Sequence, residues 1–430
     1  MKKIIVSFLI LILSIGIFAN IYQVIPKDSK LIIVMNNTKE VYSQLKTVPT
    51  FQKVLDDPTY AETLITGMID AYIQSLELES SEVYAGLENN FGIFVIEPQE
   101  NTYDFGIILG PLNNGEKYIE IFRKVINALM PEDAGLNFSY IVKKSELQDY
   151  LVITTNKEAY ENSELNFVPQ KRYNDTGIYE EINTSTMNGY GYSYVKDGYL
   201  YSKFNLLTDD EIVPTNNTFD DDKTFGLYYL RTNYLPKDLT DELSNLGLDV
   251  PKELLNSFVN NFEWATFTGT LDLKTDDQTG EIITDFGIKI TFKSNILFKD
   301  IENSIPEDIK MEKMGNEYLK LTRNVNDEMV TMYIWKNNEE YIISNLNKKD
   351  LQKYENNAVN LSKNKLYIDL KDKLPEGNLG VFLIDLKPVI AFLKDYLGVE
   401  LEGEFGGLAN VASTKTPDGK NTIEFNFVMK

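Results

Sequence analysis

Residues 285–292, Asp285-Phe286-Gly287-Ile288-Lys289-Ile290-Thr291-Phe292, alternate large apolar side chains with polar or small ones. This alternation gives a strand one dry face and one solvated face, as is usual in antiparallel sheets. The first four residue types recur at Asp104-Phe105-Gly106-Ile107. A strand-like run and a turn precede each copy, with the turns at 98–101 and 275–280. The sequence therefore predicts two copies of one β-hairpin.

The hairpins belong to a longer repeated module. Each module begins with a proline or acidic turn and a short apolar strand, and it continues with a helix that has an apolar stripe. Because the order of elements recurs, we predict an α+β fold of duplicated modules, each an antiparallel sheet covered on one face by amphipathic helices. The strand entries lie at 26–35, 221–230 and 375–384, and the stripes at 64–76, 254–262 and 389–397.

The repeats set the expected domain boundaries. Residues 1–19 form a targeting segment, and residues 20–165 form a first α+β lobe. Residues 166–223 form a strand-rich connection that ends in an acidic linker. Residues 224–430 form a second lobe with a partial third module at about 361–430, by the same pattern of strand, helix and hairpin. We expect the last strand, 422–430, to complete a sheet of the second lobe.

The N-terminal residues have the three parts of a secretory signal peptide. Lys2 and Lys3 are followed by a mostly apolar run at 4–18, and Ala19 suits the position before a cleavage site. The alternative is an uncleaved anchor, because residues 21–25 could extend the run toward the roughly 20 residues of a spanning helix. We expect a cleaved, extracytoplasmic protein, either periplasmic, in the cell envelope or secreted.

This arrangement resembles a family of bacterial exported proteins of unknown function. In that family a signal peptide precedes modules with a Pro-x-Asp-like turn, an apolar strand and an amphipathic helix. The matching residues are Ile25-Pro26-Lys27-Asp28 before Leu31–Met35, and Leu374-Pro375-Glu376 before Leu379–Ile384. The resemblance covers most of the chain after the signal. It implies an envelope location, and it transfers no activity and no site residue.

The composition removes much of enzyme chemistry. The 430 residues contain no cysteine and no histidine. This excludes Ser-His-Asp triads, thiol nucleophiles and metal centres built on histidine or cysteine. The formal net charge of −23 repels phosphate backbones and anionic lipid headgroups. We therefore expect no nucleic-acid partner and no membrane contact beyond an N-terminal anchor.

Carboxylates are the remaining candidates for catalysis or metal binding. The acidic runs 209–211, 220–222 and 272–281 lack the ligand offsets and central glycine of an EF-hand loop, so we expect solvated loops, with weak calcium binding as the alternative. Trp264 and Trp335 could stack on a sugar in a carboxylate-based glycosidase, but both lie in strand-like runs where core packing explains them. The sequence therefore assigns no catalytic residue, metal ligand or cofactor.

One strand carries the only candidate interaction surface. Tyr190, Tyr192 and Tyr194 share one face of a strand because they alternate with other residues. If exposed, they would form a stacking surface for glycans, peptides or another protein. If buried, they would form a packing layer between lobes, and this is the arrangement that we expect.

These observations favour a non-catalytic extracytoplasmic protein that has a structural role or binds another envelope protein. The first alternative is a carrier or sensor of an apolar or lipid-like ligand, which requires a large connected apolar pocket. The second is a carboxylate-based hydrolase, which requires a cleft with convergent acids of raised pKa.

Overall fold

The structure of the chain is a computed structural model. Several features predicted above lie wholly or mostly outside the residues that it describes: the signal segment, the helical stripe at 254–262, the turns at 98–101 and 275–280, and the acidic run 209–211. The described residues are 21–55, 60–96, 104–129, 137–145, 148–171, 176–184, 187–208, 212, 219–233, 262–275, 282–325, 328–397, 403–415 and 421–430.

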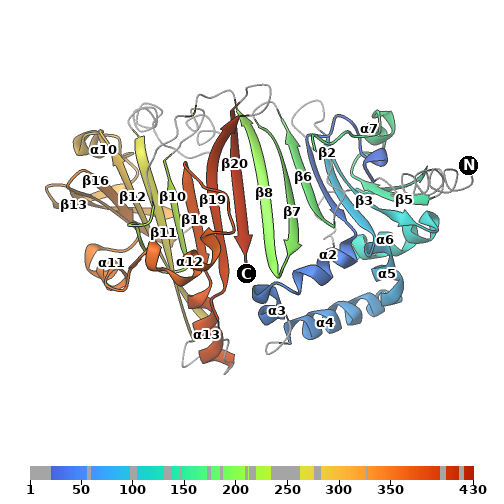
Figure 1. Cartoon of the computed structure of the whole chain (residues 1–430), viewed down its shortest axis with the longest axis horizontal. Helices are drawn as coiled ribbons and strands as arrows, with labels where there is room; N and C mark the ends of the chain where they lie inside the picture. Colours follow the sequence, from blue (N-terminus) through green and yellow to red (C-terminus); the bar gives the residue numbers. More distant parts are fainter. Residues whose placement is uncertain are drawn as a thin grey trace, which may run out of the picture. The chain divides into compact units, whose positions relative to one another are not determined.

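The chain divides into two compact units, residues 1–207 and 208–430. The first unit is built on an antiparallel sheet with the strand order β4-β5-β3-β2-β1-β6-β7-β8 (Figure 1). The predicted hairpin is confirmed, because β2 and β3 pair from Asn90 opposite Gly110 to Ile96 opposite Asp104. The strands are β1 (Leu31–Asn36), β2 (Asn90–Ile96), β3 (Asp104–Leu112), β4 (Ser139–Ser145), β5 (Gln148–Thr154), β6 (Gly177–Asn183), β7 (Asn188–Lys196) and β8 (Tyr199–Thr208).

Helices cover both faces of this sheet. On β3, Ile108 packs with the 3-10 helix η1, whereas the next residue, Leu109, packs with α5 and α6 on the opposite face. Cover on both faces differs from the single covered face that the sequence predicts. The helices are η1 (Ile21–Val24), α2 (Thr38–Leu45), α3 (Pro49–Leu55), α4 (Ala61–Ser75), α5 (Ser80–Leu87), α6 (Gly115–Leu129) and α7 (Lys157–Asn162).

The residues that follow the signal segment belong to the core of the first unit. Ile21, Tyr22, Val24 and Ile25 are all buried. The Tyr160 hydroxyl donates a hydrogen bond of 2.8 Å to the Val24 carbonyl. These four residues are therefore part of the core of the first unit. Among the described residues, no helix has both the length and the apolar character needed to cross a membrane.

The second unit has the strand order β13-β14-β15-β16-β12-β11-β10-β18-β19-β20. The second predicted hairpin is confirmed in β11 and β12, where Phe286 pairs with Leu271 and Ile288 with Gly269. The C-terminal strand β20 pairs with β19, as expected for the end of the chain. The strands are β9 (Lys223–Thr224), β10 (Tyr228–Thr232), β11 (Phe262–Thr275), β12 (Ile282–Ser294), β13 (Lys310–Gly315), β14 (Tyr318–Val325), β15 (Glu328–Asn337), β16 (Glu340–Ser344), β17 (Val359–Asn360), β18 (Gly380–Asp385), β19 (Gly406–Lys415) and β20 (Asn421–Met429).

Helices again pack on both sides of a strand. On β16, Tyr341 packs against Phe298 of α10, and the next residue, Ile342, packs near Leu351 of α11 on the other face. Within the described residues, the short strands β9 and β17 pair with each other in a separate two-stranded sheet. The helical segments are α10 (Phe298–Asn303), α11 (Lys348–Glu355), η3 (Leu361–Lys363), α12 (Lys365–Lys371) and α13 (Lys387–Leu397).

The two sheets share one strand order. In the second unit β15-β16-β12-β11-β10-β18-β19-β20 match β4-β5-β3-β2-β1-β6-β7-β8 of the first, position by position. A short polar helix follows the β4–β5 pair in the first unit and the β15–β16 pair in the second, and Asn156 caps α7 as Asn347 caps α11. The segment 166–223, expected to connect two lobes, supplies β6, β7 and β8 to the first sheet.

Candidate functional site

The tyrosines predicted to share a strand face lie on β7. Tyr192 is buried in the core of the first unit, and Tyr190 packs against that core. Tyr194 is exposed at the end of the strand, where its ring stacks on Tyr192 at 5.7 Å and on Tyr201 at 5.5 Å between ring centroids. Two of the three rings are thus held within the first unit, and one lies at its surface.

The acidic runs form structural contacts where they are described. Asp222 forms an ion pair of 3.2 Å with Arg231 and also accepts a hydrogen bond from the Tyr229 hydroxyl. Asp272 accepts a hydrogen bond of 2.9 Å from Tyr354. In the described part of the chain no group of three or more acidic residues is placed to hold a metal ion.

The two tryptophans differ in surroundings. Trp335 is buried with Ile342 and Leu351, so it cannot serve as an open stacking platform. Trp264 is partly buried, and the guanidinium of Arg231 lies 4.0 Å from the centroid of its ring. Core packing therefore explains Trp335, and the Arg231 guanidinium covers one face of the Trp264 ring in a cation–π contact.

Helix α4 carries the largest departure from the sequence prediction. Its apolar stripe was expected to pack on a sheet, but the stripe faces solvent. Leu64 and Met68 are 66% and 73% exposed. Figure 1 shows α4 running beside α3 and α5 rather than across the strands. The exposed apolar side chains of this face, at spacings of one, three and four residues, are Tyr60, Leu64, Ile65, Met68, Ile69 and Tyr72.

The polar side of α4 faces the body of the first unit instead. Glu62 accepts a hydrogen bond of 2.9 Å from the Tyr42 hydroxyl and forms an ion pair with Lys46. Asp70 accepts a hydrogen bond of 2.8 Å from the Tyr84 hydroxyl. The contact with Lys46, more than that with Tyr42, holds the pKa of Glu62 below its usual value. Polar contacts thus hold an amphipathic helix with its apolar face outward.

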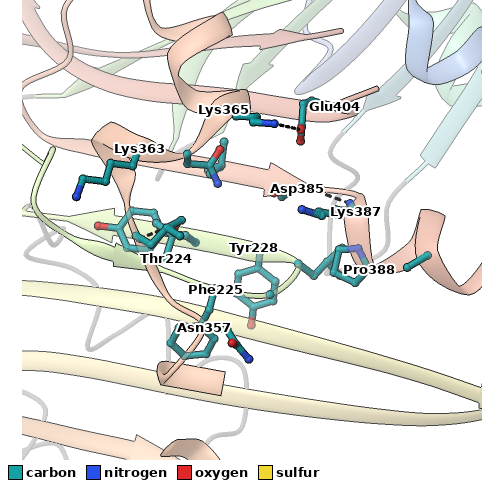
Figure 2. Close-up of a pocket in the computed structure, with 17 residues that line it drawn as sticks. Thr224, Phe225, Tyr228, Asn357, Lys363, Lys365, Asp385, Lys387, Pro388 and Glu404 are labelled. Atoms are coloured by element: carbon teal, nitrogen blue, oxygen red, sulfur yellow. Dashed lines mark hydrogen bonds and ion pairs between the residues drawn. The ribbon is translucent and has the colours of Figure 1, made fainter. Parts of the chain in front are cut away.

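A cleft of about 430 Å³ opens on the second unit (Figure 2). The pairing of β9 with β17 places the segment 224–229 beside the segment 357–365. The Asp385 backbone N–H donates a hydrogen bond of 2.8 Å to the Leu227 carbonyl, which fixes the end of β18 at the cleft. Helix α13 begins there, with Pro388 in its first turn, where proline is well tolerated.

Three lysines line this cleft: Lys363, Lys365 and Lys387. All three are exposed; Lys363 and Lys365 come from one segment of the chain and Lys387 from another. Lys365 lies 4.0 Å from Glu404, at the limit of an ion pair. Three lysines around one cleft make a locally basic surface in a chain whose net charge is −23. Figure 2 shows these lysines above the rings of Phe225 and Tyr228.

Asp385 is a partly buried carboxyl group in the cleft wall. Burial, and to a smaller extent the charge of Glu404, raises the pKa of its carboxyl, while hydrogen bonds from the Lys387 backbone N–H and the Asn364 side chain oppose that rise. The bond from Lys387 measures 3.0 Å and satisfies an amide in the first turn of α13. Asp385 therefore already has a structural role as a helix cap.

Comparison with known proteins finds no match: no protein-family model, no curated protein and no solved structure resembles this chain significantly. The two candidate sites, the apolar face of α4 and the cleft, rest on the chain's own geometry. Sequence reasoning found the stripe of α4 and gave it the wrong orientation. It missed the cleft, whose only sequence signal was the pair of lysines at 363 and 365 flanking a helix-capping asparagine.

Proposed function

We propose that this protein is a non-catalytic extracytoplasmic envelope protein that binds a partner protein through α4. The outward apolar face of that helix is the observation that carries the proposal. Soluble monomers seldom expose a contiguous apolar patch of this kind without a binding role. The signal-like pattern at residues 1–19 supports the location, and the exposed apolar face of α4 supports the binding role.

The face matches another protein better than it matches a bilayer. Helices that lie on membranes carry lysine and arginine on their polar side, and α4 has neither residue between Ala61 and Ser75. Its acidic side chains are bound by the body of the first unit. The net charge of −23 also opposes approach to anionic lipids.

A second copy of the chain fits less well than a different protein. The 15 residues of α4 span about 22 Å at 1.5 Å per residue. Two such helices bury on the order of 500 Å², whereas a specific stable interface buries at least about 1,000 Å². Two copies would also repel each other through their charge of −23 each. The partner must therefore bury more surface against this chain, and carry less negative charge, than a second copy would.

The chemistry of α4 specifies that partner. Its face is apolar and uncharged, and Glu77 and Glu79 are exposed just beyond its C-terminal end. An amphipathic helix that is apolar on one face and basic at one end would satisfy both features. Gly67 lies in the open on the same helix, with no atom within 4 Å of an added Cβ, so a second helix can approach closely.

The matching strand orders support an internal duplication. We propose that the two units arose from one ancestral α+β unit, because two unrelated sheets are not expected to share eight strand positions in one order. The observed strand order also relates the partial third module at 361–430 to β6–β8 of the first unit. The β18–α13–β19–β20 segment occupies the corresponding place in the second sheet.

A crosslinking experiment tests the binding role. A photoreactive amino acid at Met68 in the full chain, expressed in its own cells, should give one recurrent protein adduct. The same group at Gln74, exposed on the other side of α4, is the control and should give far less. The crosslinked residue of the partner should lie on an amphipathic helix. Adducts only with lipid, only with a second copy, or equal at both positions would contradict the proposal.

A binding measurement with the purified partner completes the test. The double substitution Leu64→Asp and Met68→Asp places two charges on the apolar face and should weaken binding by at least 30-fold, or about 2 kcal/mol. Thr63→Asp with Gln74→Asp adds the same charge to the same helix at exposed positions off that face. This control should retain binding within about threefold.

The two alternative functions gain unequal support from the structure. The cleft of about 430 Å³ in the second unit is lined by charged and apolar groups together. It therefore suits a small polar ligand better than a lipid chain. For the hydrolase alternative, Asp385 has a raised pKa, but its bond to the Lys387 backbone assigns it to capping.

A further inference from the structure

The lysine-lined cleft of the second unit is independent of α4 and belongs to the other unit. Its volume of about 430 Å³ falls in the range of small-molecule sites. Its lining combines three kinds of group: exposed cations, aromatic and aliphatic side chains, and amide and carboxylate groups. Each kind restricts the chemistry of a ligand.

The rim selects an anion. Lys363 and Lys387 form no ion pair among the contacts identified in the described chain, although Lys387 lies near enough to Asp385 to affect its pKa. Lys365 has only the 4.0 Å contact with Glu404. Three lysines thus line one cleft, and their ammonium groups have hydrogen bonds still to donate. A carboxylate or phosphate would pair with them, whereas a cation would be repelled.

The aromatic side selects a ring or another flat apolar group. The Tyr228 ring lies over Gly269, where an added Cβ would come within 2.0 Å of a ring carbon, so glycine is what lets the ring lie flat against the sheet. Phe225 stacks on Tyr354 with their ring centroids 6.5 Å apart. Both rings are therefore held in place before a ligand binds. Pre-ordered aromatic rings bind the apolar faces of sugars and other rings at low entropic cost.

The polar wall selects hydroxyl groups. The Asp385 carboxylate accepts hydrogen bonds from the backbone of Lys387 and the side chain of Asn364, and its oxygens have further acceptor capacity. Asn357 lines the cleft beside Phe225 (Figure 2). A simple fatty acid would leave this wall without partners, at a cost for each desolvated group. A ligand with several hydroxyl groups would satisfy it.

We propose that the cleft binds an acidic sugar, with its carboxylate at the lysine-lined rim, its ring on Tyr228 and its hydroxyl groups toward Asp385 and Asn357. The ligand can be a free sugar acid or the end of an acidic glycan, since both present the same terminal group. The cleft would thereby give the second unit a ligand of its own, whatever protein binds to α4.

Ligand-observed NMR on the intact protein tests this assignment. Glucuronate is the probe, glucose is its neutral counterpart, and inorganic phosphate tests for simple anion binding. For a ligand of this size, a Kd of about 1 mM is expected from typical ligand efficiencies. The double variant Lys363→Gln with Lys387→Gln should weaken glucuronate binding at least tenfold. Acidic oligosaccharides of two or three units should bind more tightly than glucuronate if a glycan end is the natural ligand, and no more tightly if a free sugar acid is.

A matched control removes the same charge elsewhere in the second unit. Lys299 and Lys310 are exposed and lie outside the cleft, so Lys299→Gln with Lys310→Gln should change the Kd less than twofold. Equal binding of glucose and glucuronate would overturn the role of the lysines. Phosphate binding as tight as that of glucuronate would overturn the role of the ring and the polar wall. Equal losses in the two double variants would also overturn the proposal.

Discussion

Alanine substitutions on opposite sides of α4 should have opposite consequences for stability. Ile73 lies on the inward side, is 4% exposed and packs in the core of the first unit with Val83 and Leu109. Leu64 lies on the same helix and is 66% exposed. Ile73→Ala should destabilise the first unit strongly, and Leu64→Ala should change its stability little.

The magnitudes follow from burial. Replacing a buried isoleucine by alanine costs 2–5 kcal/mol through lost transfer energy and the cavity left behind, and we expect about 3 kcal/mol for Ile73. Full burial of a leucine is worth about 2 kcal/mol, and only a third of Leu64 is covered, so at most about 0.7 kcal/mol is at stake there. The higher helix propensity of alanine offsets part of that loss. The two substitutions should differ by at least about 2 kcal/mol.

Native-state hydrogen exchange measured by mass spectrometry reads this difference within the first unit. The amides of β3 are suitable reporters, because β3 pairs with β2 and β5 on either side and exchanges when the unit opens. The opening free energy should fall by about 3 kcal/mol in Ile73→Ala and by less than 1 kcal/mol in Leu64→Ala. Equal losses would show that the stripe is packed in solution, and the proposed binding face would then be wrong.

Three further predictions concern single groups. Tyr160→Phe should destabilise the first unit by about 1–2 kcal/mol in urea unfolding, because the buried Val24 carbonyl loses its donor. Asp385→Asn should gain stability relative to wild type as pH rises. Folding raises the pKa of that carboxyl, so the wild type loses stability as pH rises from the unfolded value of about 3.8 through the folded pKa. In thermal unfolding between pH 3 and pH 7, the stability difference between Asp385→Asn and wild type should therefore widen with pH and then stay constant. Gly226→Ala should destabilise by at least about 1 kcal/mol, because φ is +80° and a backbone oxygen lies within 2.4 Å of the added Cβ, whereas Gly67→Ala should stabilise by about 0.5–1 kcal/mol in the same assay.

The hairpins were predictable because their signal is local. Strict alternation over Asp285–Phe292 specifies the strand, and the recurrence at Asp104–Ile107 marks its counterpart. It does not specify the buried face, because Phe286 is 41% exposed and Thr291 of the expected wet face is buried. The structure pairs both as expected. The helix caps are equally local, since Asn156 and Asn347 bond to backbone amides two or three residues ahead.

The orientation of α4 was not predictable for the opposite reason. Periodicity shows which residues share a helix face, but it does not show which face turns inward. That choice depends on Tyr42, Lys46 and Tyr84, which bind the acidic side of α4 from neighbouring helices. The cover on both faces of each sheet also depends on long-range packing, as between η1 and β3.

The cleft escaped sequence reasoning because its parts are far apart in the chain. Tyr228 and Lys387 are separated by more than 150 residues, and the antiparallel pairing of β10 with β18 brings their segments together. Each lysine alone has the pattern of an ordinary surface residue. Only the strand order, which the repeats indicate but do not determine, places three of them around one opening.

Both tryptophans of the chain, Trp264 and Trp335, lie between residues 208 and 430, whereas the first unit has tyrosine and phenylalanine as its only aromatic residues. Tryptophan emission is therefore an intrinsic optical label for one half of the protein. When that emission and the far-ultraviolet circular dichroism of the whole chain are recorded on one sample, a difference between the two unfolding curves gives the order in which the halves melt. No dye or engineered reporter is needed.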